Sequence, residues 1–459
     1  MAGADIRRVS ADQRGATVNA MLVASTGALA SLGDTILLPS IVLAFFVGQL
    51  TTSYVAVGMV AAIASGLWAI ARIPAQVFLG SQRRKLPWAL GASIIRAVAL
   101  ALLALATLGY APGSISGPSP ALLRTFFFCF AIFAIMNGVA SVPMEGLVIK
   151  TIPTSSRISV FRQRMIAVLV ASVVGALIAN SLLGPSGPAL PRQFALLFLV
   201  AAVCYAAIAV FIIGMNEPQR VAERQEASPL AGFHHFSSCL SDGSFTRFAL
   251  FRILLSVTAI VDPFLVIFGL TRLGVRPSAV GAYVVAFVLG VVISIPFWAF
   301  MSRHFGHRLV LQGAALLRLM PPLIALVMPQ LVSTWFWQSR FSAMYVSEVV
   351  FGAVFVCLGA SIAGQAQSTH AYLAEISPPP LLTAYTAMLN TILSVVAFVP
   401  ILGGIIIERR GYEALFISMI ALGVAAVFRS GFMRNTFVRA SSNRSLADGN
   451  ADAASRSGL

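Results

Sequence analysis

Long apolar stretches recur along the whole chain, and short polar segments separate them. Each stretch holds about 20 residues or more, the length that an α-helix needs to cross the hydrocarbon core of a bilayer. Because a lipid-exposed backbone must satisfy its own hydrogen bonds, such stretches are expected to be helical. The pattern therefore predicts an all-α membrane protein with twelve transmembrane helices, at 21–47, 54–79, 87–109, 121–146, 165–183, 194–214, 248–271, 279–301, 309–329, 343–366, 384–407 and 413–433.

The polar segments divide the chain into two halves. The longest internal one, residues 216–247, lies between the sixth and seventh spans and is interpreted as a cytoplasmic linker. It separates an N-terminal six-helix half, 17–215, from a C-terminal six-helix half, 248–434. Residues 1–16 are predicted to form a cytoplasmic N-terminal segment. The polar, small-residue-rich tail, 435–459, is predicted to be a disordered cytoplasmic segment.

Composition agrees with a protein whose surface faces lipid. Apolar residues make up 58% of the 459 positions and charged residues only 10%, whereas a soluble domain carries about 25% charged residues. The formal net charge is +16, but the Lys and Arg residues are spread between apolar runs, which argues against a nucleic-acid partner. Most of the loop Lys and Arg fall on the side of the N-terminus. The charge bias thus favours a multi-pass protein of the plasma (bacterial inner) membrane with both termini in the cytoplasm.

No cofactor and no metal site is predicted. The four cysteines are too far apart in sequence for a metal or redox motif. The one histidine pair, His234 and His235, stands in a polar loop without companion ligands.

The two halves carry matching features in the same order. Gly91–Arg96 reads GASIIR at the start of the third span, and Gly313–Arg318 reads GAALLR at the start of the ninth. Asp34 in the first span corresponds roughly to Asp262 in the seventh. Several matches in one order indicate duplication of a six-helix unit. In transporters with such repeats, the substrate site lies between the halves near the middle of the membrane.

Twelve spans, a 6+6 repeat and a central cytoplasmic loop resemble the major facilitator superfamily over nearly the whole chain. The loop motif of that superfamily, Gly-x-x-x-Asp-Arg-x-Gly-Arg-Arg, is present here in reduced form. Between the eighth and ninth spans, Gly306 and Arg308 remain, and Arg303 stands where the aspartate should be. Between the second and third spans, only a basic cluster remains, formed by Arg83, Arg84 and Lys85. The missing aspartates put the usual charge clasp between helices in doubt.

A looser resemblance links the segments 144–164 and 385–404 to bacterial members of the superfamily that have no assigned substrate. It names no cargo.

Acidic residues occur inside the predicted spans of helices one, four, seven and ten: Asp34, Glu145, Asp262 and Glu348. An ionisable side chain in the hydrocarbon costs about 2.5–3.5 kcal/mol on translocon scales, so it is retained for a partner, a cavity or a function. In the superfamily that this chain resembles, those four helices line the central cavity. The four acids are therefore candidates for a substrate or proton site.

The two aspartates are the strongest of these candidates. Pro39 follows Asp34 and Pro263 follows Asp262, and proline weakens the local helix and favours bending. Burial disfavours a charged carboxylate, so either aspartate could bind and release a proton during transport. The alternative is a static ion pair with a buried arginine. Glu145 and Glu348 lie near helix ends, where each could simply reach water.

Basic and amide side chains complete the candidate site. Arg96 and Arg318 occupy equivalent repeat positions. Structural pairing within each half is the favoured interpretation, and a cationic site for an anionic substrate is the alternative. Arg72, close to Trp68, belongs to a gate or to the cavity. Arg252 lies near the cytoplasmic end of its span and is expected to snorkel to the interface. Two amides, for which interhelical hydrogen bonding is the default, are the remaining candidates: Asn137 and Asn390.

These features predict a secondary active transporter that moves a small molecule across the bilayer by alternating access, with proton coupling left open. One alternative is a transporter-like receptor or scaffold that carries nothing. A membrane-embedded lipid-modifying enzyme is less favoured, because no catalytic constellation is found; His370 and Glu375 are five positions apart, too far for one helical face. Gly184-Pro185 comes only at the end of the fifth span, which counts against a drug/proton antiporter.

Overall fold

The computed structural model describes residues 2–110, 119–152, 156–217, 236–333 and 343–435, and within these ranges it contains helices and no strand. The predicted all-α fold is therefore confirmed. The N-terminal half comprises α1 (Ala2–Ile36), η1 (Pro39–Leu43), α2 (Ala44–Leu50), α3 (Tyr54–Ala62), η2 (Ile63–Leu67), α4 (Trp68–Gly80), α5 (Leu86–Leu108), α6 (Pro120–Thr151), α7 (Arg157–Leu183) and α8 (Arg192–Ile213). The C-terminal half comprises α10 (Phe236–Ser241), α11 (Gly243–Val257), η4 (Thr258–Val261), α12 (Asp262–Arg272), η5 (Pro277–Ala279), α13 (Val280–Ser333), α15 (Ala343–Ile376), η6 (Pro379–Leu381), α16 (Leu382–Val396) and α17 (Pro400–Ser430).

Ten helical segments of the described chain are long and apolar enough to cross a membrane. Two of them, Pro277–Ser333 with 57 residues and Pro379–Ser430 with 52, are too long for one crossing. An uninterrupted helix of either length would measure about 80 Å, more than twice the ~30 Å hydrocarbon core. Each contains a glycine with positive φ, Gly306 at 82° and Gly411 at 83°, where the chain turns back. Because each long segment holds two crossings, the predicted twelve spans are accommodated.

Prolines interrupt the helices near both aspartates of the first and seventh spans. The first span changes from α1 to η1 at Pro39 and continues as α2. The seventh span passes from α11 through a short 3-10 turn, η4, into α12, which begins at Asp262 followed by Pro263. Proline has no N–H to donate and crowds the preceding turn. The helix breaks that the prolines predict therefore lie close to Asp34 in the first span and at Asp262 in the seventh.

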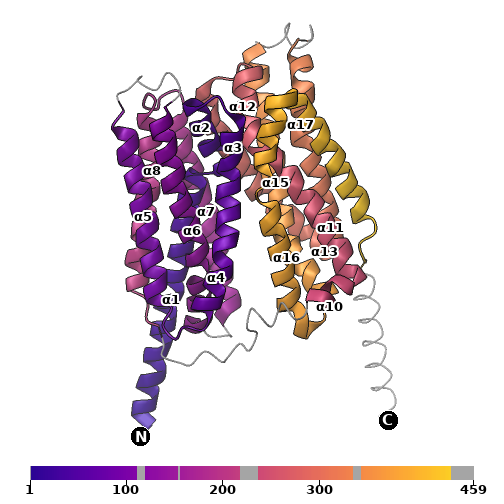
Figure 1. Ribbon diagram of the computed structural model, residues 1–459. Coiled ribbons are helices and arrows are strands. Elements are labelled where there is room, and N and C mark those ends of the chain that lie inside the picture. The colour runs from indigo at the N-terminus through magenta and orange to yellow at the C-terminus, as the bar shows by residue number, and fades with distance from the viewer. Residues whose placement is uncertain (1, 111–118, 153–155, 218–235, 334–342, 436–459) are drawn as a thin grey trace, which may run out of the picture.

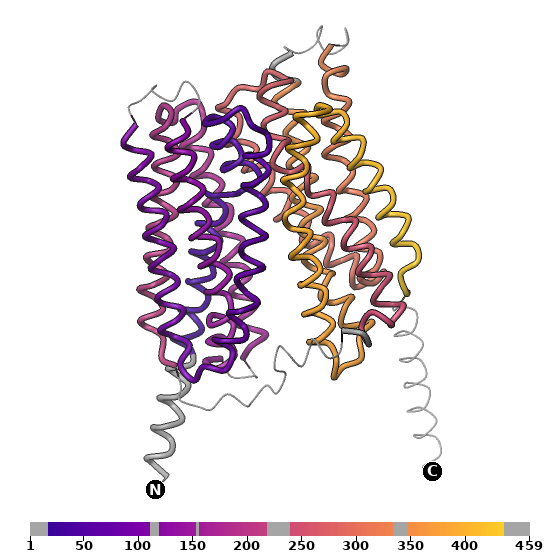
Figure 2. Tube along the Cα trace, viewed as in Figure 1, coloured from indigo at the N-terminus to yellow at the C-terminus, as the bar shows by residue number. Residues whose placement is uncertain are grey.

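The two halves form separate bundles that meet near one end and stand apart at the other (Figures 1 and 2). We call the end where Ala2 and Asn435 lie the terminus side, and the opposite end the contact end. At the contact end α3 lies against α17, and α7 lies against the start of α13. Glycines permit this approach: a Cβ atom on Gly404 would lie 2.5 Å from the carbonyl oxygen of Tyr54, and one on Gly281 would lie 2.7 Å from Cα of Asn180. The structure thus shows the halves closed at the contact end.

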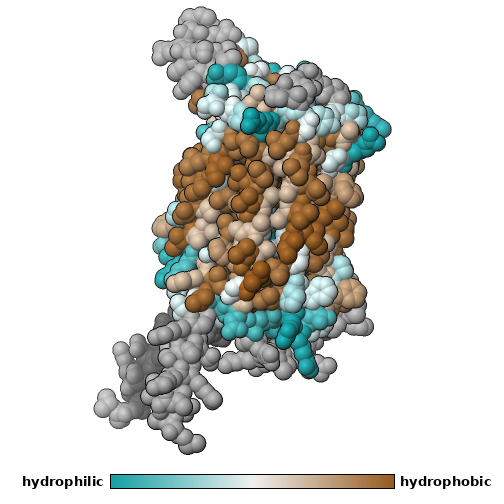
Figure 3. Space-filling view, turned by 90° about the vertical axis from the view of Figure 1, so that its left-hand side faces the viewer, coloured by the Kyte–Doolittle hydropathy of each residue, from teal (hydrophilic) through white to brown (hydrophobic). Residues whose placement is uncertain are grey.

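An apolar band covers the face of the N-terminal half seen in Figure 3, and hydrophilic residues border it above and below. Large hydrophobic side chains are exposed on helices of both halves, among them Leu105 (65% exposed), Val203 (60%) and Ile293 (67%). A contiguous apolar surface of this extent is stable only against lipid. The protein is therefore a multi-pass membrane protein.

Helices extend beyond the predicted six-helix halves. Helix α1 begins at Ala2, inside the segment predicted to precede the first helix. Helices α10 and α11 begin inside the predicted linker, where Asp242 caps α11 by accepting a hydrogen bond from the Ser244 backbone at 2.8 Å. The sequence signal for this start is an Asp before an apolar run. Most of the tail and the pair His234–His235 lie outside the described residues.

Candidate functional site

In the C-terminal half, Asp262 and Arg318 form a buried ion pair. Asp262 begins α12, and Arg318 extends from α13 so that its Nη2 lies 2.5 Å from Oδ1 of Asp262. Nε of Arg318 also lies 3.4 Å from the hydroxyl oxygen of Thr258. The side chains of Arg318 and Asp262 are 4% and 14% exposed. The pair joins helix seven to helix nine within one half and neutralises both charges.

In the N-terminal half, Asp34 and Arg96 are connected through a tyrosine. Tyr205 of α8 donates its hydroxyl to Oδ1 of Asp34 at 2.5 Å. The guanidinium of Arg96 lies over the Tyr205 ring, 4.6 Å from its centroid. Arg96 also donates to Oδ1 of Asn137 at 2.9 Å and to the hydroxyl of Ser93 at 2.8 Å. Helices one, three, four and six thus meet around the Asp34 carboxylate, which itself stays accessible while Tyr205 and Arg96 beneath it are buried.

The two clusters occupy equivalent positions but are not copies. Each contains an aspartate on the first helix of its half and an arginine on the third. In the C-terminal half the arginine contacts the carboxylate directly, whereas in the N-terminal half Tyr205 lies between them. Sequence reasoning did not identify Tyr205, because a single tyrosine in an apolar run resembles an ordinary packing residue.

A second charged group lies nearer the terminus side of the N-terminal half. Nη2 of Arg72 on α4 donates to both carboxylate oxygens of Glu145 on α6, at 2.8 and 2.9 Å. Trp68 stacks one turn away, 5.5 Å from the Arg72 guanidinium carbon. The Glu145 side chain is 57% exposed. Arg164 of α7 adds its positive charge close to Glu145. Like Asp34, this group is accessible, whereas the Asp262–Arg318 pair is largely buried.

Two other sequence candidates do not join these groups. Glu348 of α15 pairs with Arg276, which precedes α13 at the contact end; Nε of Arg276 lies 2.7 Å from Oε1. This ion pair raises the pKa of Arg276. Asn390 is exposed on α16. The structure therefore places Glu348 at the end of its helix.

Arg252 does not reach out to the interface as expected. Its Nη1 donates instead to Oε1 of Gln365 on α15 at 2.8 Å. Its Nε is buried and has no acceptor among the described residues. Gln365 is held in turn, because its Nε2 donates to the hydroxyl of Ser361 at 3.2 Å. The prediction that Arg252 snorkels was wrong, because α15 lies close enough for Gln365 to accept a hydrogen bond from the guanidinium inside the bundle.

The basic loop between the second and third spans has an acidic partner. Glu217, which follows α8, accepts the backbone N–H groups of Lys85 and Leu86 at 3.0 Å, and Nζ of Lys150 lies 2.9 Å from it. Lys150 also donates to the carbonyl oxygen of Arg83 at 2.6 Å. Burial favours the neutral acid, but these donors outweigh it and hold the pKa of Glu217 below its usual value. Burial and the nearby Lys150 charge lower the pKa of Lys85.

The clasp that the reduced loop motif left in doubt is therefore made by an acid from a different segment. In the C-terminal half the corresponding loop turns at Gly306, and Nη2 of Arg308 donates to the carbonyl oxygen of Gly431 at 2.7 Å. Arg84 is exposed on the terminus side.

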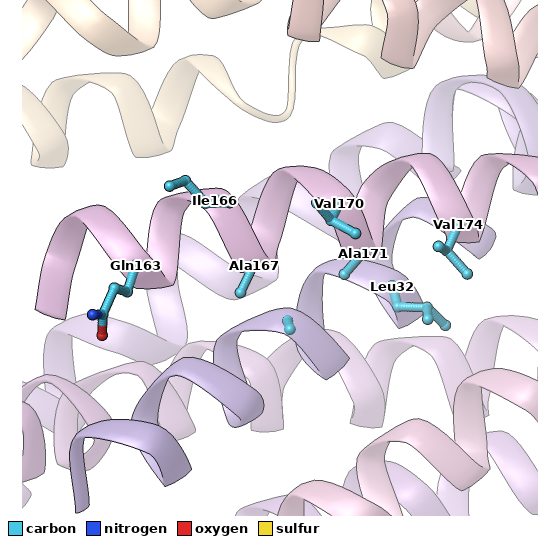
Figure 4. Close-up of a pocket in the computed structure, with 8 residues that line it drawn as sticks. Leu32, Gln163, Ile166, Ala167, Val170, Ala171 and Val174 are labelled. Atoms are coloured by element: carbon cyan, nitrogen blue, oxygen red, sulfur yellow. The ribbon is translucent and has the colours of Figure 1, made fainter. Parts of the chain in front are cut away.

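Figure 4 shows an apolar groove of about 480 Å³ between α7 and α1. Its lining is almost entirely aliphatic, with Gln163 as its polar member, and comprises Ala28, Leu32, Gln163, Ile166, Ala167, Val170, Ala171 and Val174. The groove offers packing space and no charged group. Among the described residues no cluster of three His, Cys, Asp or Glu could hold a metal ion, and the four cysteines are unbridged.

No protein-family model and no curated protein matches the chain. Solved structures of transporters match it over nearly its full length. The nucleoside transporter NupG is 14% identical, with a TM-score of 0.62, and the match covers 90% of this chain and 98% of that one. A D-xylose-proton symporter is 12% identical, with a TM-score of 0.62 and coverage of 91% and 98%. The chain has the major facilitator fold. A bacterial homologue of the lysosomal transporter Spinster, in an inward-facing and unoccupied conformation, shares this fold at 14% identity, a TM-score of 0.59 and coverage of 93% and 98%.

Proposed function

We propose that this major facilitator protein is a secondary active transporter that moves a small molecule through the bilayer by alternating access. The observation that carries the proposal is that two six-helix halves meet at the contact end and separate on the terminus side, and that each half holds an aspartate–arginine cluster within its bundle. Rocking of one half against the other would expose a site between them to each side in turn.

Protons are the proposed coupling ion. Asp262 and Asp34 lie at the breaks of helices seven and one, where a change of backbone shape would change each carboxylate's contacts. In the C-terminal half, protonation of Asp262 would remove the charge that holds Arg318. A carboxylate whose only charged partner moves away takes up a proton. The D-xylose-proton symporter shows that this fold supports proton coupling in another protein.

The terminus side is proposed to be the cytoplasmic side of a bacterial inner membrane. The excess of loop Lys and Arg on this side supports the orientation, and the likeness to an inward-facing neighbour agrees with it. No enzymatic activity is proposed, because Asp262 is paired with Arg318 and Asp34 is hydrogen-bonded to Tyr205, and neither is arranged with a second acid or base around a reacting atom. A scaffold without transport is the second interpretation, and it gives no reason for an aspartate inside the first span of each half.

Spin labels on the terminus side test alternation directly. In a variant lacking the native cysteines, one label replaces Ile158 at the start of α7, which is 84% exposed, and the other replaces Arg303 on α13. These helices touch at the contact end, so their other ends report the opening. Double electron–electron resonance in lipid nanodiscs should give a long and a short distance population whose ratio changes with pH. A label pair at Ile158 and Gln82, both in one half, should give one constant distance.

A single long distance at every pH would contradict alternating access and favour the scaffold. An unchanged ratio between two populations would retain alternation but remove protons as the coupling ion.

A further inference from the structure

The charges inside the spans do not balance. Away from the ends and kinks of the described helices there are three carboxylates and five guanidinium groups. The carboxylates are Asp34, Glu145 and Asp262, and the guanidinium groups are those of Arg72, Arg96, Arg164, Arg252 and Arg318. Asp262 neutralises Arg318, and the Asp34 cluster contains Arg96. Glu145 forms an ion pair with Arg72, and its negative charge also acts on Arg164. The remaining arginine is Arg252. Its described partner is a neutral amide, which orients the guanidinium without compensating its charge.

We propose that Arg252, oriented by Gln365, is the residue that binds an anionic group of the cargo, so that the transported molecule carries a carboxylate or phosphate. This inference rests on the proposed transport function. A guanidinium offers five N–H donors in a planar arrangement that matches the oxygens of a carboxylate or phosphate. In Arg252 one Nη1 donor is used by Gln365, and the buried Nε has no acceptor among the described residues. Nε of Arg96 and Nη1 of Arg318 also lack an acceptor there, but each of those arginines has an aspartate nearby. A bound oxyanion would supply the missing acceptor and the missing negative charge together.

The position of Arg252 suits a binding residue. It lies on the seventh span and Gln365 on the tenth, and both residues are partly exposed. Arg252 precedes Asp262 by almost three helical turns, about 15 Å along the span. It therefore lies on the terminus side of the Asp262 cluster, the side on which the halves stand apart. An anion entering between them would meet Arg252 before it reaches the proton-binding candidate.

The surplus positive charge extends to the opposite half. Arg72 and Arg164 share one carboxylate, Glu145, whose side chain is more than half exposed. The described spans therefore carry a net positive charge in both halves. Such a charge attracts an anion and disfavours a cation.

Ligand-free stability separates a binding arginine from a structural one. A charge kept for a ligand destabilises the empty protein, so Arg252→Gln should raise its melting temperature by about 2–4 °C or leave it unchanged. A structural arginine would instead lower it on removal. Arg247→Gln, an exposed arginine on the same helix, is the matched control and should have no effect.

Binding is then measured on purified protein in detergent with inorganic phosphate, acetate, succinate and glucose 6-phosphate as sodium salts. Sodium chloride at equal ionic strength corrects for screening. At least one of these anions should raise the melting temperature of wild type and of Arg247→Gln, and fail to do so for Arg252→Gln. Arg252→Lys should retain part of the shift, because it keeps the charge and loses the planar fork.

A fall in ligand-free stability for Arg252→Gln, protection by none of the anions, or protection that survives in Arg252→Gln would each overturn the proposal. Binding in detergent requires no transport, so a protein that binds these anions through Arg252 but never alternates would refute the transport function and leave the anion site standing.

Discussion

Gly404 on α17 is the position at which a single methyl group should shift the conformational equilibrium. A Cβ atom there would lie 2.5 Å from the carbonyl oxygen of Tyr54 and 2.5 Å from both N and Cα of Val55. These atoms belong to the backbone of α3 in the other half, so no change of rotamer relieves the contact. Gly404→Ala should therefore disfavour closure at the contact end while leaving each half intact.

The size of the effect follows from the displacement required. Ordinary van der Waals contact begins near 3.4 Å, so the two helices must separate by about 1 Å. Inserting a methyl group into a well-packed contact costs about 1–3 kcal/mol. This energy falls on the conformation closed at the contact end alone, so the ratio of the two conformations should change by about 5- to 150-fold.

The Ile158–Arg303 spin-label pair measures this ratio. In Gly404→Ala the long distance, which marks the conformation open on the terminus side, should lose population to the short one. Gly91→Ala is the matched control, because a Cβ atom there would meet nothing within 4 Å. Gly359→Ala is a second control: its methyl group would meet the backbone of Phe287 in the same half, so it should lower the melting temperature without changing the ratio. A folded Gly404→Ala protein with the wild-type distribution would refute the reasoning.

Three further predictions follow from the ion pairs and caps. Asp262→Asn leaves Arg318 buried and unpaired, so it should lower the free energy of unfolding by about 3–5 kcal/mol. Adding Arg318→Gln should recover most of the lost melting temperature. An additive loss in the double variant would show that the two residues are not coupled. Because the pKa of Glu217 is held below its usual 4.5, its stabilising contribution is complete above that pH and is lost as the pH falls through the lower folded value. Glu217→Gln should lower stability by about 1–3 kcal/mol at pH 7 and flatten this acid dependence, and an identical melting profile from pH 7 to pH 3 would contradict it. Glu408 accepts hydrogen bonds from Ser53 and from the Val55 backbone across the halves. Glu408→Gln should therefore shift the spin-label ratio in the same direction as Gly404→Ala, by about two- to five-fold. An unchanged ratio would show that this contact does not stabilise the closed contact end.

Most of the fold could be predicted because bilayer thickness fixes the length of each span. The helices fell close to the predicted ranges, and the glycines at 306 and 411 explain why two of them appear joined. Helix ends facing water were harder to place. The tenth helix runs to Ile376, beyond the predicted 366, because polar residues there are tolerated once the helix leaves the lipid.

The partners of the buried charges could not be predicted in the same way. Hydropathy identifies a charge inside a span, but the residue that satisfies it depends on which helices touch. Tyr205 lies far from Asp34 in the sequence, and Glu217 stands in a segment that resembles an ordinary linker. Arg252 shows the converse: its position suggested an exposed end, whereas the neighbouring helix holds it inside through Gln365.

Proton movement in proteoliposomes tests the transport function most directly. Purified protein is reconstituted with a pH-sensitive dye inside the vesicles, and pools of small metabolites are added from outside. At least one pool should drive a proton flux, and Asp262→Asn should abolish this flux. Glu413→Gln changes an exposed acid on α17 and should leave the flux unchanged. A folded protein that populates both conformations yet moves no protons with any pool, or one whose flux survives Asp262→Asn and Asp34→Asn, would contradict proton-coupled transport.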